Sequence, residues 1–389
     1  MESIGMGTIA FLVLFPVLVA LIQLFVKNDG ARCGLTVFGA AVTAIGSVVL
    51  AVMFLPQEAQ QFAVDGMVST NVTYAALAVD VALGIYIIGK SIRWKNYIAL
   101  LLALAQTVLI VWFELTQAHD IAVAHALYID NLSIIMALII GVIGSGIAVY
   151  ALGYMKVHEE HNDGPDRRPV FFAVMFAFLG AMFGIVFFNN LAWMLACWEV
   201  TTVCSFSLIG YTRTEEAIRN SFRQIILNLI GGLAFACALV WIANVYGTLE
   251  LDAFLSKTQA FATGGYEIVT YAPLLLLALA GFTKATQFPF QSWLLGAMVA
   301  PTPTSALLHS STMVKAGVFL ILKLAPCLGF NMPGFIVMMV GGATFLFAAL
   351  AAISQTNAKR VLAYSTISNL GLIVACAGVG TSGAVWAAT

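Results

Sequence analysis

The feature that most limits what this chain can fold into is a series of apolar runs, each about 20 residues long. Inside lipid only helices and closed barrels satisfy their own backbone polar groups, and runs of this length are those of helices. The sequence therefore predicts an all-α, polytopic membrane protein with about twelve transmembrane helices. These helices are expected near 5–26, 34–55, 73–91, 97–115, 130–154, 170–188, 190–211, 221–246, 271–299, 304–325, 333–354 and 360–380.

Composition excludes the soluble classes of protein. The chain of 389 residues is 61% hydrophobic and only 9% charged, which describes a protein surrounded by the lipid bilayer. A net charge of −1 and the lack of long basic runs exclude nucleic acid as a partner. The first run, 5–26, has neither a basic segment before it nor a small-residue cleavage site, so we expect it to stay as a membrane span.

The basic residues alternate between loops, which tests the number of helices independently. Thirteen of the 17 Lys and Arg residues lie in every other loop, and Lys257 is the exception in the loops between them. By the positive-inside rule these basic loops face the cytoplasm, so we expect a multi-pass protein of the cell inner (plasma) membrane with its N-terminus outside. The thirteen are Lys27, Arg32, Lys90, Arg93, Lys95, Lys156, Arg167, Arg168, Arg213, Arg219, Arg223, Lys359 and Arg360.

A lysine interrupts the ninth run. Lys284 lies five residues before Pro289 in a stretch that is otherwise apolar enough to cross a membrane. A lysine at mid-membrane costs about 2.5–3.5 kcal/mol, so charged groups at this depth usually line a hydrated cavity or an ion path. Pro289 removes one backbone hydrogen bond and frees the carbonyl of Ala285, so the helix is expected to break beside the lysine.

An acid is buried in the seventh run. Glu199 lies about ten residues into an apolar helix, and its short side chain cannot carry the carboxylate to water. The functional interpretation is an ion-translocating group, and the structural alternative is an ion pair that locks two helices. Both interpretations need a buried cation, and Lys284 is the obvious partner, although desolvation disfavours its charged form.

Polar side chains line one face of the tenth run. Ser305 and Thr312 flank His309 at i−4 and i+3, and Ser311 precedes Lys315 by one turn. A hydrogen-bonded row of hydroxyl, imidazole and ammonium groups can pass a proton by short hops. The alternative is that these groups only join neighbouring helices.

Other charged and sulfur-containing residues are less informative. Asp130 opens the fifth run, where an acid either supports ion movement or only caps the helix. Asp80 lies in a helix that looks peripheral, and its role is undetermined. Lys323 lies near a helix end and is expected to snorkel without a further role. The six cysteines lack the spacing of metal ligands, so neither a metal nor a cofactor is expected in this chain.

Three segments together resemble a known family, the proton-conducting antiporter-like membrane subunits. This family includes the large antiporter-like subunits of respiratory complex I (NADH:quinone oxidoreductase), the A subunit of Mrp-type Na⁺/H⁺ antiporters and subunits of energy-converting membrane-bound hydrogenases. The similarity runs from about Asp130 to the end and is densest from Glu199 to Ser368. The segments are "NNLAWMLACWEVTTVCSFSLIGY", "KATQFPFQSWLLGAMVAPTPTSALLHSSTMVKAGVFLILKLAP" and "NAKRVLAYSTISNLGLI".

The resemblance implies roles for individual residues. Glu199 matches the essential acid of the family, Lys284 the lysine of the broken helix paired with it, and His309 the histidine of the following helix. Lys359 matches a basic residue on the link toward a second half-channel, whereas hydropathy alone places it at the cytoplasmic edge. Lys315, where complex I members often have an uncharged residue, resembles the hydrogenase and Mrp branches.

The resemblance also implies an inverted-repeat architecture. Residues 1–129 would hold N-terminal helices, with an extra pair at 73–115 relative to a complex I subunit. Residues 130–330 would form the first half-channel around the broken helix 271–299, and 331–389 would begin the second repeat. The second broken helix of the family does not occur in this sequence, so either the sequence is incomplete or the second half-channel is missing.

These observations predict a proton-translocating, antiporter-like subunit of a redox-driven pump, with the energy-converting hydrogenase branch favoured. The alternatives are an Mrp-type Na⁺/H⁺ antiporter A subunit and a complex I antiporter-like subunit. Partners would be other membrane and peripheral subunits, with protons, or Na⁺, as the transported ion. A membrane hydrolase or transferase would need a nucleophile–base pair or a metal cluster near an interface, and neither pattern occurs, so no catalytic centre is expected in this chain.

Overall fold

The computed structural model describes residues 2–118, 121–160, 166–262 and 268–384. Within these ranges eleven helical segments are long and apolar enough to cross a membrane. They are α1 (Glu2–Phe25), α2 (Asp29–Phe54), α3 (Gly66–Arg93), α4 (Tyr97–Thr116), α5 and α6 (Asn131–Leu138 and Ser145–Glu160, joined by a π-helical turn), α7 (Arg168–Phe187), α8 (Leu191–Ile209), α9 (Glu215–Tyr246), α13 and α14 (Thr302–Ala306 and Met313–Leu324, joined by a π-helical turn), α15 (Met332–Ile353) and α16 (Ala358–Val379).

The remaining elements are short. The expected broken helix is present as α11 (Ile268–Lys284) followed by α12 (Ser292–Gly296), so the predicted all-α, polytopic fold is confirmed. The sequence did not predict helix α10 (Leu251–Ala262), which is too short to span a bilayer. It also missed strands β1 (Gln60–Phe62) and β2 (Leu127–Ile129), which pair antiparallel with Gln60 opposite Ile129.

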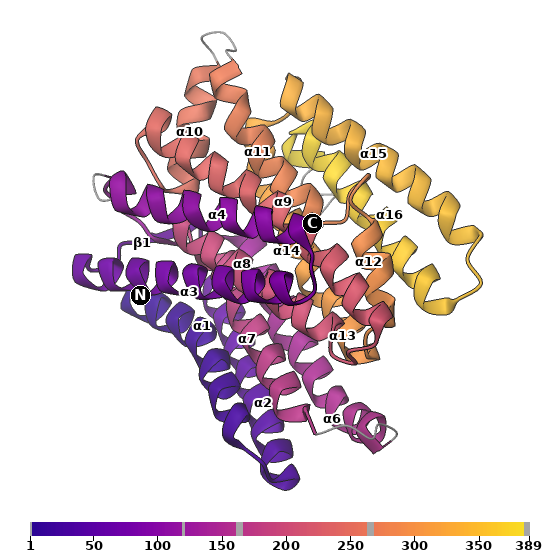
Figure 1. The fold of residues 1–389 in the computed structure, drawn as a ribbon. Coiled ribbons are helices and arrows are strands. Elements are labelled where there is room, and N and C mark those ends of the chain that lie inside the picture. The colour runs from indigo at the N-terminus through magenta and orange to yellow at the C-terminus, as the bar shows by residue number, and fades with distance from the viewer. Residues whose placement is uncertain (1, 119–120, 161–165, 263–267, 385–389) are drawn as a thin grey trace.

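Helices α7 and α8 form the centre of the molecule. In the spanning stretch of α7, 83% of residues are buried by protein, and in that of α8 78%, against 11% for α3; the α13–α14 span, at 81%, is also central. Helix α1 packs on α7, and α15 and α16 pack mainly on each other. Figure 1 shows α1 and α2 at one end, the α15–α16 pair at the other, and α3 and α4 side by side across the front. The α3–α4 hairpin contacts α8 and α9, so a peripheral element reaches the central helices.

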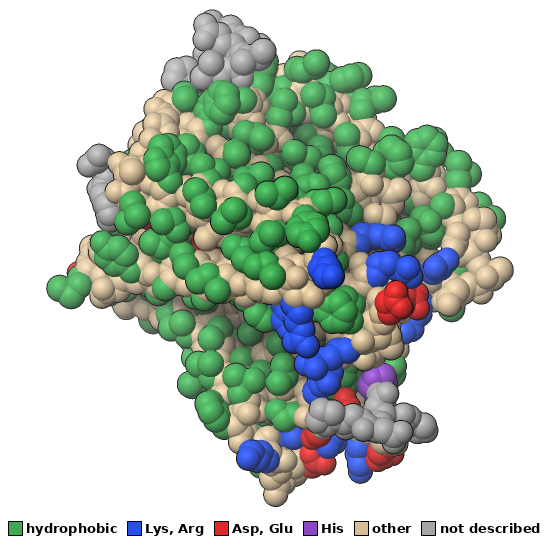
Figure 2. Space-filling model, viewed as in Figure 1, with side chains coloured by type: hydrophobic (Ala, Val, Ile, Leu, Met, Phe, Trp, Pro, Cys, Tyr) green, Lys and Arg blue, Asp and Glu red, His purple; other side chains and the backbone are tan. Residues whose placement is uncertain are grey.

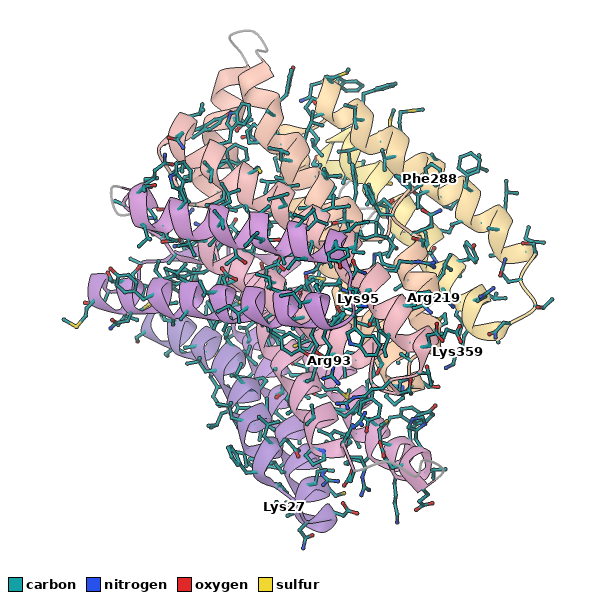
Figure 3. All side chains as sticks on the ribbon, viewed as in Figure 1. Lys27, Arg93, Lys95, Arg219, Phe288 and Lys359 are labelled. Atoms are coloured by element: carbon teal, nitrogen blue, oxygen red, sulfur yellow. The ribbon has the colours of Figure 1, made fainter. Side chains whose placement is uncertain are left out.

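Basic side chains gather along one side of this apolar surface. In Figure 2 the Lys and Arg atoms form a band at the lower right of the view, whereas hydrophobic side chains cover much of the rest. Figure 3 places Lys27, Arg93, Lys95, Arg219 and Lys359 in this band, although they come from four separate loops or helix ends. The helices therefore carry alternate loops to the same side, as the charge pattern predicts.

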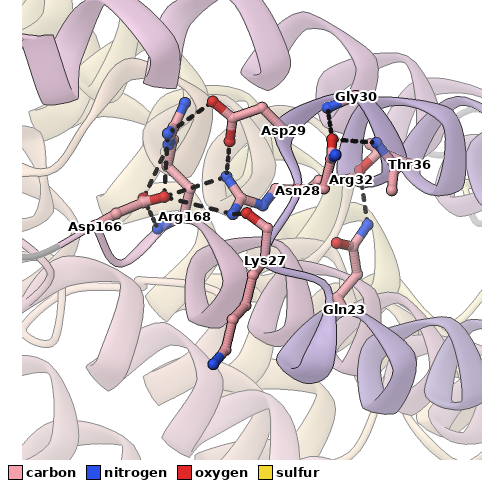
Figure 4. Close-up of polar contacts among 10 residues, drawn as sticks. Gln23, Lys27, Asn28, Asp29, Gly30, Arg32, Thr36, Asp166 and Arg168 are labelled. Carbon is pink, nitrogen blue, oxygen red and sulfur yellow. Dashed lines mark hydrogen bonds and ion pairs between the residues drawn. The ribbon is translucent and has the colours of Figure 1, made fainter.

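Part of this band is a network of ion pairs between the α1–α2 turn and the start of α7 (Figure 4). Arg32 bonds Asp29 at 2.8 Å and Asp166 at 3.4 Å, and Arg168 bonds Asp166 at 2.9 Å and Asp29 at 3.1 Å. Each arginine thus contacts both carboxylates. Arg32 is 3% exposed, while Asp29 is 60% and Asp166 40% exposed, so the network holds a buried arginine between carboxylates that reach the surface.

Candidate functional site

The ninth span breaks immediately after its lysine. Helix α11 ends at Lys284, and the side-chain amide of Gln287 donates to the carbonyl of Ala285 at 2.9 Å. The indole N–H of Trp293 donates to the carbonyl of Thr283 at 2.9 Å. The predicted break is confirmed, and side chains of the following segment satisfy the carbonyl groups that the break exposes.

Lys284 is completely buried at this break. Its Nζ donates to the carbonyl of Trp198 at 2.7 Å and to Oγ1 of Thr201 at 2.6 Å, and it lies 4.1 Å from the centre of the Trp198 ring. Two acceptors and an aromatic face stabilise an ammonium group that is buried from the surrounding solvent. The sequence indicated the lysine but not these partners, because hydropathy does not show which helix faces α11.

Glu199 is close to Lys284 but does not bond it. The carboxylate is 4% exposed, and the ion pairs among the described residues do not include one between Glu199 and Lys284. The expectation of a direct pair is therefore wrong for this conformation. Each group has other partners: the ammonium group donates to Trp198 and Thr201 on α8, and the carboxylate interacts with Gln106 of α4.

A glycine makes room for the carboxylate. A Cβ atom at Gly232 of α9 would lie 2.2 Å from Oε1 of Glu199 and 2.8 Å from Oε1 of Gln106. No side chain fits at either distance without displacing these groups. Gly232 thus lets α9 approach the carboxylate of Glu199 closely.

The α3–α4 hairpin contributes buried polar groups that the sequence analysis did not assign to the site. Asp80 of α3 is 8% exposed and Gln106 of α4 is 4% exposed, and both line a small cavity with Glu199. The helix that looked peripheral is peripheral only on its outer face. A period of 3.6 residues would have placed Asp80 on the same face as Gly84 and Ile87, which are also buried.

The polar row around His309 does not form as predicted. Residues 307–311 are a π-helical turn, and Thr312 leaves the helix at φ −140° and ψ −76°. Among the described residues, both ring nitrogens of His309 and Oγ of Ser305 are buried without a hydrogen-bond partner, and Thr312 donates to the carbonyl of Leu307 at 2.6 Å. The expected i−4 and i+3 contacts are wrong because they assume a regular α-helix, whereas π-helical turns occur often at functional sites.

Lys315 and Lys359 lie apart from the buried centre. Lys315 follows the π-helical turn and is partly buried, and the hydrogen bonds found among described residues include none from its ammonium group. The side chain of Ser311, its expected neighbour, lies outside the described residues. Lys359 lies in the first turn of α16, within electrostatic range of Tyr154 of α6 and inside the basic band. This is the edge position that hydropathy predicted.

Asp130 and Lys323 form an ion pair at the opposite end of the bundle from the basic band. Asp130 caps α5 by accepting from the backbone N–H of Ser133 at 2.8 Å, and its other oxygen bonds Nζ of Lys323 at 2.6 Å. The lysine also lies 4.4 Å from the centre of the Tyr128 ring. The capping interpretation is confirmed, whereas Lys323 pairs with an acid rather than extending freely to the interface.

Nearby charges shift the pKa values of groups around the Asp130–Lys323 ion pair. Burial alone would raise the pKa of the Asp130 carboxyl, but the charge and hydrogen bond of Lys323, with the hydrogen bonds from Ser133, lower it below its usual value. Burial, helped by the nearby Asp130 and Asp252, raises the pKa of Tyr128 to about 12. These residues line a pocket of about 280 Å³.

The described residues offer no obvious place for a resident metal ion. In these ranges no three His, Cys, Asp or Glu side chains come close enough together to hold one. The six cysteines are all free thiols. The chemistry available at the buried centre is therefore that of carboxyl, amide, hydroxyl and ammonium groups, which can bind and transfer protons.

Comparison of sequences identifies relatives of the chain. Residues 189–389, more than half of it, match the family described as "NADH:quinone oxidoreductase/Mrp antiporter, TM". Residues 112–164 match "NADH-Ubiquinone oxidoreductase (complex I), chain 5 N-terminus". The first match contains Glu199, Lys284, His309 and Lys359.

Individual relatives are bacterial. The "Putative antiporter subunit mnhA2" of Staphylococcus haemolyticus is 38% identical over 255 residues, which cover 65% of this chain and 31% of that protein. Its counterpart in Staphylococcus epidermidis is 39% identical over 257 residues, with 65% and 31% covered. The chain thus spans about a third of the length of the curated relatives it matches.

Solved structures share the fold. A chain in the structure of the Mrp complex from Dietzia sp. DQ12-45-1b matches with a TM-score of 0.60 and 30% identity, covering 81% of this chain and 35% of that one. A chain of the membrane-bound sulfane sulfur reductase, an archaeal respiratory membrane complex, matches with a TM-score of 0.69 and 17% identity, covering 95% and 64%. The second likeness shows the fold alone.

Proposed function

Because this chain belongs to the NADH:quinone oxidoreductase/Mrp antiporter transmembrane family, we propose that it carries protons across the membrane as an ion-translocating subunit of a larger complex. The observation that carries the proposal is Lys284, a fully buried lysine at the break of a membrane helix, close to the buried Glu199. Buried charges at mid-membrane are costly and mark ion paths. We assign the half-channel to residues 130–330.

In this mechanism Lys284 alternates between two sets of partners. With Trp198 and Thr201 as acceptors, as in this structure, the ammonium group is separated from the carboxylate of Glu199. When a conformational change brings Glu199 closer, its charge stabilises the ammonium form, and separation favours release of the proton. Moving one charge against 100 mV requires about 2.3 kcal/mol, which is within the range of making or breaking one buried ion pair.

The released proton would continue toward the π-helical turn of the next span. His309 has two buried ring nitrogens that find no partner in the part of the chain that the structure describes, so either nitrogen is available to accept or donate a proton once water or a moved side chain reaches it. Lys315 follows on the same span, and Lys359 would connect to a later part of the path. Asp130, Ser305, Ser311 and Thr312 would play supporting roles.

The type of complex is a separate part of the proposal. The two Staphylococcus relatives are putative antiporter subunits, and one matched structure is of an Mrp complex. They favour an Mrp-type antiporter over the hydrogenase-type complex that the sequence analysis preferred. The hydrogenase-type complex stays as the alternative, because the fold shared with a respiratory membrane complex does not distinguish the two. Identifying the subunits that purify with this chain would separate the two, because only a redox-driven complex contains electron-transfer subunits.

Transport by variants tests the mechanism. In vesicles containing the whole complex, Glu199→Gln and Lys284→Met should each abolish proton transport with assembly intact, and the double variant should be no worse than either single one. His309→Ala should slow proton transport. If the complex is redox-driven, proton transport should not require Na⁺, whereas Na⁺-dependent transport would indicate an Mrp-type antiporter. Wild-type rates in either Glu199→Gln or Lys284→Met would contradict proton conduction through this pair.

Orientation has its own test. If the basic band faces the cytoplasm, single cysteines placed at 156–160 and 213–219 in a cysteine-free background should react with an impermeant thiol reagent only from the cytoplasmic side. Labelling of both segments from outside would reverse the proposed orientation, including the external N-terminus.

A further inference from the structure

We propose that the α3–α4 hairpin supplies a second proton-holding acid, Asp80, which exchanges a proton with Glu199 through one water molecule in the cavity between them. The proposal rests on the proposed function of Glu199 and extends it to a hairpin to which neither the sequence nor the comparisons assign a role. The hairpin would then be part of the proton path and not a peripheral addition.

The cavity lies between helices α3, α4, α8 and α9. It has a volume of about 20 Å³ and is lined by Asp80 of α3, Gln106 and Thr107 of α4 and Glu199 of α8, with apolar side chains around them. About 10–15 Å³ is enough for one water molecule, provided that it finds two to four polar partners. The cavity meets both conditions, since four of its lining side chains carry oxygen.

Three buried oxygens face this space without partners. Oδ1 of Asp80, Oε1 of Gln106 and Oε1 of Glu199 have no hydrogen-bond partner among the described residues, and each of these side chains is more than nine-tenths buried. An unpaired buried polar atom is costly, and three at one cavity indicate a missing donor. A water molecule or a proton on one carboxyl group provides that donor.

The charges around Asp80 favour a shared proton. The ionisable groups within electrostatic range are Glu114 of α4 and Glu199 and Cys197 of α8, and none of them is a cation. Neighbouring carboxyl groups cannot both ionise cheaply in a buried site, so such a pair retains a proton. Lys284 offsets only part of this charge, because it interacts with Glu199 and not with Asp80.

A proton fits this site better than Na⁺. The described His, Cys, Asp and Glu side chains do not come together as a ligand set, and the cavity accommodates only about one water molecule. Hard cations take six or more oxygen ligands, whereas proton exchange needs only two titratable groups and a bridge. In the exchange, the carboxylic acid of Asp80 gives its proton to the water, which gives another to the carboxylate of Glu199, leaving Asp80 ionised.

The hairpin also provides a route toward one membrane surface. Glu114, buried at 7% exposure, lies in the last turn of α4, at the end opposite to Arg93 and Lys95. Asp80 lies near the middle of α3, so Glu114, Asp80 and Glu199 lead inward from the side opposite to the basic band. The two helices are held closely, since a Cβ at Gly84 would lie 2.2 Å from Oγ1 of Thr107.

Infrared difference spectroscopy of the purified complex tests the shared proton directly. A protonated carboxyl group buried in the protein should give a carbonyl stretch that shifts in D₂O, and Asp80→Asn should remove or shift this band. The matched control is Asp65→Asn, the same change at the exposed cap of the same helix, which should leave the band unchanged. A band that is identical in wild type and Asp80→Asn would overturn the proposal, whether or not the complex transports protons.

Transport provides the second readout. Asp80→Asn should slow proton transport about 10-fold or more and change its pH profile, and Asp80→Glu should restore part of the rate. This comparison is made under conditions where Glu199→Gln is inactive. If Asp80→Asn then keeps the wild-type rate and pH profile, Glu199 receives its proton by another path, and the proposal is overturned. A band that responds to Na⁺ at constant pH would also overturn it, because it would indicate cation binding. Failure of Glu199→Gln to affect transport would contradict the proposed function alone.

Discussion

The chain contains two clusters of charged side chains that differ in how completely they are paired. At the basic band, Asp29, Arg32, Asp166 and Arg168 contact one another in a closed network near water. At the centre of the bundle, Glu199 and Lys284 are both buried, yet no ion pair among the described residues joins them. A closed network stabilises one arrangement, whereas groups with unused partners can change partners, which is what ion movement requires.

Removing one cation from each cluster should therefore have opposite consequences for transport and for stability. Lys284→Met should lower proton transport by about 100-fold or more, because the proton carrier is lost, while the complex still assembles. Arg32→Met should leave transport within about twofold of wild type but should destabilise the protein by about 1 kcal/mol, since it removes hydrogen bonds to two partly exposed carboxylates. Transport by vesicles and thermal unfolding, measured on both variants, check this; slow transport in Arg32→Met would contradict the separation of roles.

A glycine at the centre allows a smaller and more local perturbation. Gly232→Ala places a methyl group against Oε1 of Glu199, and overpacking of this kind costs about 1–3 kcal/mol, or roughly 10-fold when it is expressed in a rate. The matched control is Gly89→Ala in α3, where an added Cβ meets no atom within 4 Å. We expect slower transport only in Gly232→Ala. Equal rates in the two variants would mean that the position of the Glu199 carboxylate is not critical.

The two buried lysines can be compared in the same way. Lys323→Met leaves the carboxylate of Asp130 without its partner, so it should destabilise the protein by about 1–3 kcal/mol, and adding Asp130→Asn should recover part of this loss. Lys284 is bonded to a carbonyl and a hydroxyl rather than to an acid, so Lys284→Met should not be destabilising in this way. Thermal unfolding of the three variants checks the difference. Additive losses in the double variant would show that the pair contributes no coupling energy.

The fold could largely be predicted because segments that cross a membrane can be recognised from their apolar composition. Length, apolar content and alternating basic loops gave the number of spans and a common side for their basic ends, and Pro289 marked the break after Lys284. Helix α10 and the strand pair β1–β2 were missed, since they are too short to give a periodic signal. Their boundaries depend on tertiary contacts such as that between Gln60 and Ile129.

The site was predictable only as a set of charged positions. Glu199 and Lys284 stand out because a charge in an apolar run is rare, but their neighbours Gln106 and Thr201 do not, and Asp80 looked peripheral. Which helices are adjacent is set by packing between distant segments, which one sequence does not show. The predicted row at His309 was wrong for a different reason, because nothing in the residue pattern indicated that the helix would change to a π-helical turn there.

The smallest effect is expected from acid at the closed network. Burial alone would raise the pKa of the Asp166 carboxyl, but the hydrogen bonds and charge of Arg168, with the charge of Arg32, lower it. A carboxyl group whose pKa is lower in the folded state stabilises the protein above its unfolded pKa of about 3.9, and this contribution is lost as the pH falls through the folded value. Asp166→Asn should therefore slightly lower thermal stability near neutral pH and remove this component of the acid-induced loss.

Salt distinguishes this explanation from a general effect of acid. Asp166 is 40% exposed, and exposed ion pairs contribute only about 0–1 kcal/mol and are screened by salt. The difference between wild type and Asp166→Asn should therefore shrink when the ionic strength is raised to about 1 M, where the screening length is about 3 Å. A difference that persists in high salt would mean that Asp166 acts through backbone capping at Arg168, to whose N–H it also bonds at 2.9 Å. Local backbone geometry would then stabilise the network more than charge does. The network and the buried centre would differ in their position in the fold rather than in how completely their charges are paired.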